Sequence, residues 1–383
     1  AIPGLGPTQF GTLLAMSPKV TSALSRHAAG NPQYALQVIG EWIARGCLSA
    51  GPDGFSVPTA ELADLPADLH GMWLRRVDRA VRLDAEGLES IELAAVLGVR
   101  VEEDLWVAAC THAGIAPARA AVTELLRHAL LVAEPDGWRF SHPLLHDAVL
   151  ASIQTPARWH EAAAAALAER GDDDADRLRR LSRHLVEAGR PSEAWPPAQK
   201  ASQLLVHLGE YEAAAATSRF IGQGLAGDTH TEERLLATIQ EARVLGRMRR
   251  FAPAQALLGQ VRAEANEEHP RALAQLALES GVLFRFLAGK LDEAERSFSD
   301  AQRRFTSLGD TEGYTDALRG QGLVQFNRGN LTAAISTLSE SLAILSRHDR
   351  PHTLAMTLVS LGWVHVAAGH PGPARRALER GLD

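Results

Sequence analysis

The chain has 383 residues, which at ~150 residues per domain allows two or three domains and excludes a single small module. Its 39 basic and 46 acidic residues give a formal net charge of −7, which excludes coating of nucleic acid as the main role. The two cysteines, Cys47 and Cys110, are too few and too far apart for a disulfide scaffold or a paired-cysteine metal site.

The sequence contains no signal for a membrane or for export. No run approaches the ~18 consecutive apolar residues of a membrane helix, and the opening AIPGLGPTQF lacks the charged and apolar regions of a signal peptide. We therefore expect a cytoplasmic protein. Because the chain starts at Ala1 without a methionine, in a stretch rich in Gly and Pro, we also expect a piece of a longer protein.

The first 80 residues have the composition and end signals of helices. Aromatic residues make up only 5% of the chain, and Ala and Leu are abundant, which favours a mainly α fold. Prolines at first-turn positions and glycines near the ends mark helix boundaries. The predicted elements are helices over 17–29 and 32–46, a hairpin over 47–57 and a helix from Pro66 through Val77.

Residues 84–141 have the order of elements of a winged-helix domain. Three helices, over 84–97, 102–112 and 117–127, precede two short strands at 130–133 and 138–141. In a DNA reader, the third helix would enter the major groove and carry several exposed cations. Here that helix has only two arginines, partly balanced by a glutamate, so a packing domain is favoured over DNA recognition.

From residue 172 onward the pattern changes to paired helices with a 40-residue repeat. Each repeat has an anchor residue and, three residues later, an alanine at the start of a second helix. The blocks are Gly209-Glu210-Tyr211-x-x-Ala214, Phe251-x-x-Ala254, Gly289-Lys290-Leu291-x-x-Ala294, Gly329-Asn330-Leu331-x-x-Ala334 and Gly369-His370-Pro371-x-x-Ala374. Helical hairpins of this kind bury their apolar faces only by stacking. This resembles the tetratricopeptide repeat, lengthened from ~34 residues, and implies an α-solenoid.

Small side chains are predicted where the two helices of each hairpin cross. The residues seven positions before the turn are mostly small, as close helix packing requires: Ser202, Ala242, Val282, Gly322 and Gly362.

The repeat also predicts a partner-binding surface on the first helix of each hairpin. The period places Arg243, Arg247, Glu279, Phe286, Arg319 and Asn327 there, together with Leu283, Leu323, Phe326 and Trp363. This mixture of charged, amide and apolar groups suits an extended peptide or protein partner. Burial between hairpins is an equally good explanation for Leu323, Phe326 and Trp363.

Catalytic motifs are missing from the sequence. The only lysines are Lys19, Lys200 and Lys290, and none of them lies in the GxxxxGK[ST] pattern that cradles phosphates. We find neither a nucleophile with a neighbouring base nor paired carboxylates in a recognisable motif. We therefore predict that this segment has no enzymatic activity and holds no cofactor or metal.

Two motifs resemble the STAND class of signalling ATPases. They are Gly30-Asn31-Pro32, and Ser141-His142-Pro143 with the following Leu-Leu-His-Asp-Ala-Val. The resemblance implies that Pro32 packs near the adenine and that His142 contacts the β-phosphate of ADP held by a nucleotide-binding domain outside this sequence. Ser141 and Pro143 depart from the methionine and aspartate of the class.

Simpler explanations exist for both motifs. Gly-Asn-Pro is also an ordinary helix end followed by a first-turn proline, and His142 suits a helix cap or a packed histidine. His142 and His146 are four residues apart on one helical face, a spacing compatible with a metal, although no third ligand is evident.

The resemblance implies a partial helical domain over 1–80, a winged helix over 81–155, connecting helices over 156–188 and the repeat solenoid over 189–383. It implies the sensor segment of a bacterial signalling ATPase, using ATP or ADP in the full-length protein. The attached output domain would be a Ser/Thr protein kinase, so the full-length protein would be an ATPase or a kinase. The alternatives are an ATP-dependent LuxR-type transcription regulator and a freestanding repeat scaffold. Expected partners are a protein or peptide, the protein's own nucleotide-binding domain and a second copy of the chain.

Overall fold

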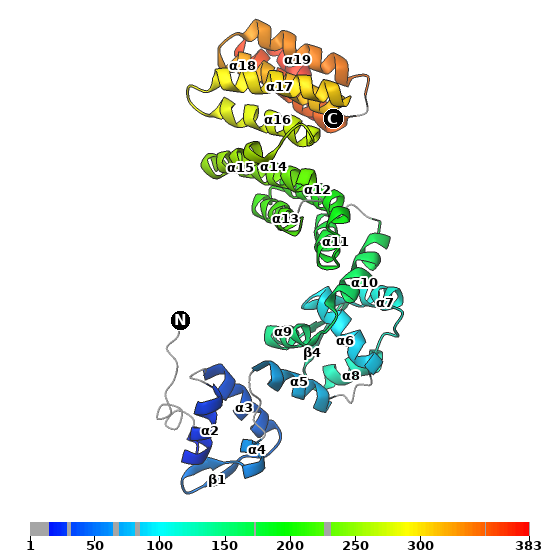
Figure 1. The fold of residues 1–383 in the computed structure, drawn as a ribbon, viewed down its shortest axis with the longest axis vertical. Coiled ribbons are helices and arrows are strands. Elements are labelled where there is room, and N and C mark those ends of the chain that lie inside the picture. The colour runs from blue at the N-terminus through cyan, green and yellow to red at the C-terminus, as the bar shows by residue number, and fades with distance from the viewer. Residues whose placement is uncertain are drawn as a thin grey trace. The chain divides into compact units, whose positions relative to one another are not determined.

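A computed structural model describes residues 15–28, 32–63, 69–80, 85–171, 174–225, 231–348 and 350–382. The chain is mainly helical, as predicted, and forms two compact units that divide after Arg170 (Figure 1). We call Ala1–Arg170 unit 1 and Gly171–Asp383 unit 2. The predicted connecting segment 156–188 is shared between them, because α10 (Pro156–Glu169) belongs to unit 1 and α11 (Ala175–Glu187) to unit 2.

The first part of unit 1 packs around a small apolar core. Its elements are α2 (Pro18–Ala28), α3 (Pro32–Ala44), β1 (Ser49–Gly51), β2 (Gly54–Ser56), α4 (Thr59–Ala63) and α5 (Leu69–Ala80). Leu24, Val38 and Trp42 are buried in this core together with Met72 from α5. The strands pair antiparallel, with Ser49 opposite Ser56, as the predicted hairpin requires. The expected helix start at Pro66 lies outside the described residues.

The second part of unit 1 contains the predicted three helices and two strands, each within about two residues of its expected position. Its elements are α6 (Ala85–Leu97), β3 (Arg100–Glu102), α7 (Glu103–Ala113), α8 (Arg119–Arg127), β4 (Leu131–Glu134), β5 (Gly137–Phe140) and α9 (Pro143–Ser152), followed by α10. The sequence did not predict β3, which pairs with β5 in an antiparallel sheet of order β3-β5-β4. The other strands are marked in the sequence by the turns that join them in pairs, whereas β3 lies between two helices and has no such turn. A Cβ atom on Gly137 would collide with the Val101 carbonyl, so the close approach of β3 explains this glycine.

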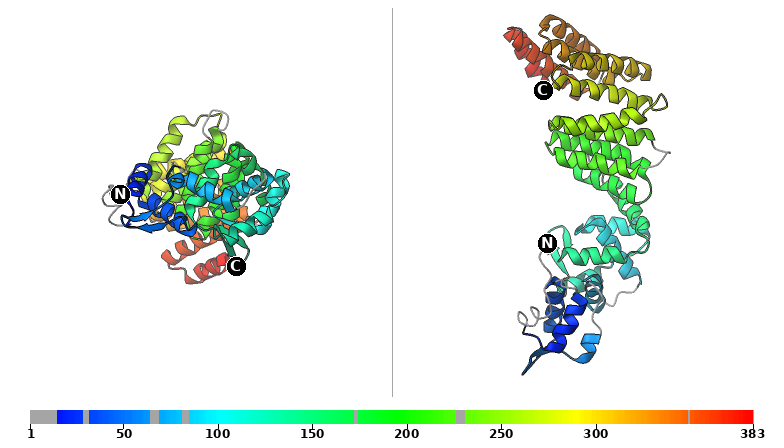
Figure 2. Two further views of the ribbon diagram at one scale, coloured as in Figure 1. Left: turned by 90° about the horizontal axis from the view of Figure 1, so that it is seen from below. Right: turned by 60° about the vertical axis from the view of Figure 1, so that its left-hand side comes forward.

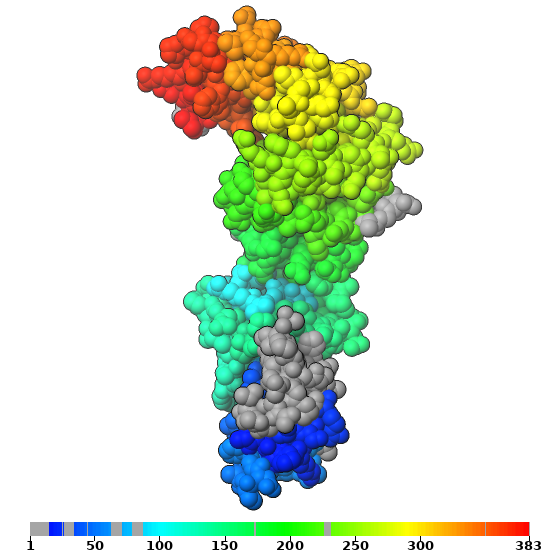
Figure 3. Space-filling model, turned by 90° about the vertical axis from the view of Figure 1, so that its left-hand side faces the viewer, coloured from blue at the N-terminus to red at the C-terminus, as the bar shows by residue number. Residues whose placement is uncertain are grey.

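Unit 2 is a stack of helical hairpins in chain order (Figure 2). After α11 come α12 (Pro191–His207), α13 (Tyr211–Gly224), α14 (Thr231–Arg247), α15 (Phe251–Glu264), α16 (Pro270–Phe286), α17 (Leu291–Leu308), α18 (Thr311–Asn327), α19 (Leu331–Leu345), α20 (Pro351–Ala367) and α21 (Pro371–Leu382). The second helices begin at residues 211, 251, 291, 331 and 371, which confirms the 40-residue period. In the space-filling view the segments of unit 2 adjoin one another in chain order, from green through yellow to red (Figure 3).

The small residues predicted at the helix crossings are located there. A Cβ atom on Gly362 would lie 2.6 Å from Leu378 Cγ, and one on Gly322 would lie 2.9 Å from Leu338 Cγ. Ser202 is fully buried, and its hydroxyl accepts a hydrogen bond from Ser218 Oγ at 3.3 Å. In these repeats a larger side chain would force the two helices apart.

The turn inside each hairpin places one residue in the left-handed backbone region. Glycine occupies this position at Gly209, Gly289, Gly329 and Gly369, with φ between 72° and 80°. The remaining repeat has Arg249, with φ 59°. A residue with a Cβ is disfavoured by about 1–2 kcal/mol in this region.

We expect Arg249→Gly to raise the free energy of unfolding by roughly 0.5–1 kcal/mol, because relief of backbone strain exceeds the added flexibility of the unfolded chain. Urea denaturation of unit 2 measures the change. The mirror substitution Gly289→Arg, at φ 72°, should lower stability instead. Equal stability of all three proteins would contradict this role of the turn residue.

Candidate functional site

Unit 2 contains a cavity of about 550 Å³. The first helices of successive hairpins, α12, α14, α16, α18 and α20, supply most of its wall, and α15 and α17 close its floor with Phe251, Leu258 and Phe298. The wall combines arginines and carboxylates with apolar side chains. A cavity of this size and lining is typical of ligand sites in proteins.

Most of the residues predicted for partner binding line this cavity. The structure brings together Arg243, Arg247, Glu279, Phe286 and Arg319, with Leu283 and Leu323. Three other predicted residues are not among the lining residues. Phe326 packs with the apolar cluster around Leu338, Trp363 is 62% exposed, and Asn327 Nδ2 donates to the Arg285 carbonyl at 3.4 Å.

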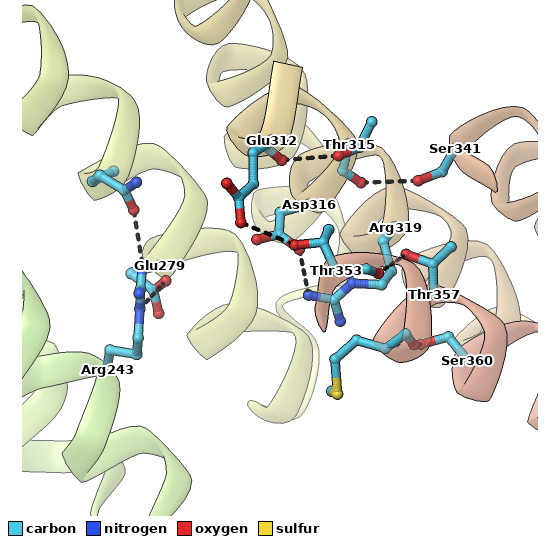
Figure 4. Close-up of polar contacts among 12 residues, drawn as sticks. Arg243, Glu279, Glu312, Thr315, Asp316, Arg319, Ser341, Thr353, Thr357 and Ser360 are labelled. Atoms are coloured by element: carbon cyan, nitrogen blue, oxygen red, sulfur yellow. Dashed lines mark hydrogen bonds and ion pairs between the residues drawn. The ribbon is translucent and has the colours of Figure 1, made fainter. Parts of the chain in front are cut away.

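Arg243 and the buried Glu279 form an ion pair in the cavity wall (Figure 4). Arg243 Nε donates to Glu279 Oε1 at 2.8 Å, and a terminal nitrogen donates to Gln275 Oε1 at 2.8 Å. Burial by itself would lower the pKa of Arg243, but the charge and hydrogen bond of Glu279 and the charge of Asp316 outweigh it, and the pKa is raised. Arg243 therefore remains charged.

The other carboxylates of the wall are also engaged. Arg319 donates to Asp316 Oδ1 at 2.8 Å, within α18 (Figure 4). Glu312 accepts a hydrogen bond from Thr353 Oγ1 at 3.1 Å and pairs with Arg350 at 3.1 Å. These contacts join α18 to α20 through polar groups at the rim.

Arg285 is a lining residue that the sequence pattern did not single out. Its guanidinium carbon lies 4.2 Å from the centre of the Phe286 ring, and Phe286 stacks on Phe251 at 5.9 Å. Burial lowers the pKa of Arg285, and the positive charge of Arg319 lowers it further. Arg285 is four residues before the turn glycine Gly289, where no repeat-wide pattern distinguishes it from a surface cation.

Two histidines from distant helices meet at the cavity wall. His207, at the end of α12, and His352, in the first turn of α20, have ring centres 4.7 Å apart in an edge-to-face arrangement. Desolvation and the neighbouring His207 lower the pKa of His352, and Arg247 and Arg319 lower it as well, against an opposing effect of Asp316. This contact connects helices that are far apart in the sequence.

We expect the stability of unit 2 to rise with pH through the range just below the ordinary histidine pKa of ~6.5. The folded-state pKa of His352 is depressed, so in this range the unfolded chain binds more protons than the folded chain. His352→Gln should reduce the slope of the free energy of unfolding against pH. The contribution of His365, whose pKa is also lowered, should remain. Denaturation between pH 5 and 8 measures both slopes, and an unchanged slope would refute the assignment.

In unit 1, His142 is the N-cap of α9. Its Nδ1 accepts a hydrogen bond from the Leu144 backbone N–H at 3.1 Å, and its ring stacks on Trp73 at 5.4 Å. The guanidinium of Arg76 lies over the same Trp73 ring. The capping contact is therefore present. Because Nδ1 is the acceptor, the proton of a neutral His142 ring is on Nε2.

His146 does not share the environment of His142, contrary to the expectation of a common helical face. It is 9% exposed, its Nε2 lies 2.9 Å from the Ala95 carbonyl oxygen, and its ring meets the edge of Phe140. A carbonyl only accepts, so Nε2 carries a proton there. Packing between α6 and the sheet has turned this side chain into the core.

Pro32 is the first residue of α3, as predicted, whereas Gly30 and Asn31 lie outside the described residues. In the described ranges no group of three or more His, Cys, Asp and Glu side chains is placed to hold a metal ion. Nor does that part of the chain include a helix long and apolar enough to cross a membrane.

No family model and no curated protein matches the sequence. Among solved structures, the chain is similar to a signal transduction ATPase with numerous domains (STAND) that has a tetratricopeptide repeat sensor, from Pyrococcus horikoshii. The match has a TM-score of 0.59 at 13% identity and covers 100% of this chain and 54% of that one, so the chain spans about half the length of that protein.

Two other structures have lower scores. A Rap protein in complex with Competence and Sporulation Factor has a TM-score of 0.45 at 14% identity, over 58% of this chain and 71% of that one. BtubC from P. vanneervenii has a TM-score of 0.40 at 18% identity, over 58% and 89%. The likeness to the STAND protein shows the fold, a mainly α chain with a tetratricopeptide-like solenoid.

Proposed function

We propose that unit 2 is a sensor module that binds a peptide, or an extended segment of a partner protein, in its cavity. The observation that supports this most is the composition of the wall, to which the first helices of successive hairpins all contribute. An occupant of the cavity would therefore contact several repeats at once and change their packing together. The similar STAND protein from Pyrococcus horikoshii has a tetratricopeptide repeat sensor, which agrees with this role.

The lining favours a peptide over a purely apolar ligand. Arg243, Glu279 and Gln240 offer hydrogen-bonding groups beside the apolar side chains of Leu283 and Leu323. Amide and charged groups recognise the main chain and polar side chains of a peptide, and the apolar wall holds its anchors.

Filling the cavity tests this proposal. Gly246 lines the cavity, and a Cβ atom there would meet nothing within 4 Å. The indole ring of Gly246→Trp should therefore fill part of the cavity without distorting α14. Gly259→Trp is the matched control, because Gly259 is on the exposed side of α15 with equally open surroundings. Peptides selected from a random display library on the wild-type chain are then measured against both variants.

We expect these peptides to bind the wild type and Gly259→Trp equally and to lose at least about tenfold in affinity with Gly246→Trp, which corresponds to ~1.4 kcal/mol. Equal binding to all three proteins would place the peptide site elsewhere. A library that yields no specific binder at all would contradict the proposed function.

We further propose that the chain is the regulatory segment of a STAND-type ATPase, with a partial helical domain over 1–80, a winged helix over 81–155 and the repeats as its sensor. The whole-chain likeness in fold supports this. The nucleotide-binding domain and an output domain, a Ser/Thr kinase or a LuxR-type DNA-binding domain, would lie outside this sequence. A freestanding scaffold is the alternative and would bind no nucleotide.

His142 is the residue that we assign to the nucleotide in this proposal. Its Nδ1 is occupied by the cap, which leaves Nε2–H as the donor for a phosphate oxygen. The ring stacked on Trp73 orients that nitrogen. Pro32, at the start of α3, would lie near the adenine.

The test uses the natural full-length protein. His142→Ser keeps a capping oxygen but removes the Nε2 donor, and it should weaken ADP binding roughly 10- to 150-fold, the equivalent of ~1.5–3 kcal/mol for a hydrogen bond to a charged group. His128→Ala, at an exposed helix end, is the control. His146→Ala is unsuitable, since it removes the bond to the Ala95 carbonyl. Equal ADP affinity in calorimetry for wild type and His142→Ser would exclude the contact.

A further inference from the structure

We infer that the cavity of unit 2 recognises a carboxylate, through the arginines of its lining that have no carboxylate partner, Arg247 and Arg285, on a peptide with an adjoining apolar side chain. This rests on the proposed function of the cavity as a peptide site and assigns the chemical class of its ligand.

The charges of the cavity wall do not balance. Five arginines line the cavity: Arg243, Arg247, Arg249, Arg285 and Arg319. Only three carboxylates face them, those of Glu279, Glu312 and Asp316. The lining therefore has a surplus of two positive charges, by 5 − 3.

Each of these carboxylates already has a partner. Glu279 pairs with Arg243, Asp316 with Arg319, and Glu312 with Arg350 and Thr353. Within the described part of unit 2, Arg247 and Arg285 have no carboxylate partner. Arg319 Nε is buried with no acceptor among the same residues. This region therefore has more donors than acceptors.

The positive charges of the cavity wall lie close enough to repel one another. Arg319 lies close enough to Arg285 to lower its pKa by repulsion, and Arg247 and Arg319 both lower the pKa of His352. Like charges held together on α14, α16 and α18 repel one another, and a bound anion would relieve this repulsion. The planar fork of a guanidinium matches a carboxylate with two parallel hydrogen bonds.

The cavity wall also offers an apolar surface beside its cations. The Arg285 guanidinium lies over the Phe286 ring, and Leu323 and Met356 line the same cavity. An acidic group bound at Arg285 would thus have an apolar surface beside it for a neighbouring side chain.

The experiment uses four pools of fluorescent random hexapeptides with matched apolar content. The first pool has a free C-terminal carboxylate and no acidic side chain. The second has an amidated C-terminus and contains one Asp or Glu residue. The third is amidated and neutral, and the fourth is amidated with one phosphoserine. Binding is measured on the wild type, Arg285→Gln, Gly246→Trp and Arg296→Gln. Arg296 is an exposed arginine of α17 outside the cavity lining, so its variant has the same change in net charge.

We expect at least one of the two carboxylate pools, the first and the second, to bind the wild type about tenfold or more tightly than the neutral pool. Comparison of these two pools shows whether the cavity prefers the C-terminal carboxylate of a chain or an acidic side chain. Arg285→Gln should lower binding of the carboxylate pools to the level of the neutral pool measured on the same variant. Arg296→Gln should retain the preference. Thermal denaturation of Arg285→Gln checks that the fold is kept, and the loss of a repelling charge beside Arg319 should not destabilise it.

The two ways of failing are distinguishable. If all pools bind equally and Gly246→Trp removes that binding, the cavity is a peptide site but the carboxylate inference is wrong. Tighter binding of the phosphoserine pool than of both carboxylate pools would also overturn the inference. If no pool shows binding that Gly246→Trp removes, the proposed function fails, and the inference fails with it.

Discussion

Replacing Phe298 by alanine is expected to lower the free energy of unfolding of unit 2 by about 3–5 kcal/mol, the range for deleting a buried phenylalanine. Phe298 is 0% exposed and lies on α17. A Cβ atom on Gly281 would be 2.8 Å from its ring, and one on Gly320 would collide with it. The ring fills the space between α16 and α18, and two glycines have no side chains that could collapse into the vacancy.

Urea denaturation of unit 2 measures this loss. Phe286→Ala is the control, because Phe286 is 49% exposed in the same unit and should cost about 1 kcal/mol or less. Hydrogen exchange should show the loss mainly in α16, α17 and α18, since each hairpin is stabilised by its neighbours. Similar losses for the two variants would contradict the packing role of Phe298.

Replacing Arg243 by methionine is expected to cost about 3 kcal/mol, because it leaves the Glu279 carboxylate buried without its cation. The Glu279 side chain is 8% exposed, and the Arg243 side chain 27%. Methionine retains most of the aliphatic volume, so the loss reports on charge more than on packing.

The double variant Arg243→Met with Glu279→Leu provides the matched comparison. Removal of both charges from a buried site is often neutral or stabilising, so the double variant should be more stable than the single one. The interaction free energy from the double-mutant cycle measures the coupling. A double variant as unstable as the sum of the two single variants would show that the pair is not coupled.

The architecture of unit 2 could be predicted from the sequence because it is local and repeated. A 40-residue period places the anchors Tyr211, Phe251 and Leu291 at the same point of successive hairpins, and each helix begins where the period requires. Stacking of similar units then determines which helix of each hairpin lines the cavity. This is why Arg243, Glu279 and Arg319 were predicted together from sequence and line one cavity.

The period did not reveal how side chains from different repeats combine. Arg285 became prominent only when α18 brought Arg319 beside it, and His207 met His352 only because the stack brings α12 to α20. Likewise, the two glycines that contact Phe298 can be explained only once the position of its ring is known. Such contacts depend on the rotation between successive hairpins, which a repeat length does not specify.

In unit 1 the sequence by itself determined the order of three helices and a hairpin, because helix caps and turn residues are local signals. Only the tertiary structure decided the roles of the two histidines that the sequence placed on one face. His142 caps α9 and stacks on Trp73 outside the core, whereas His146 lies in the core and hydrogen-bonds to the Ala95 carbonyl of α6. The physical reason is that a buried histidine needs a hydrogen-bond partner, and that partner comes from an element distant in the sequence.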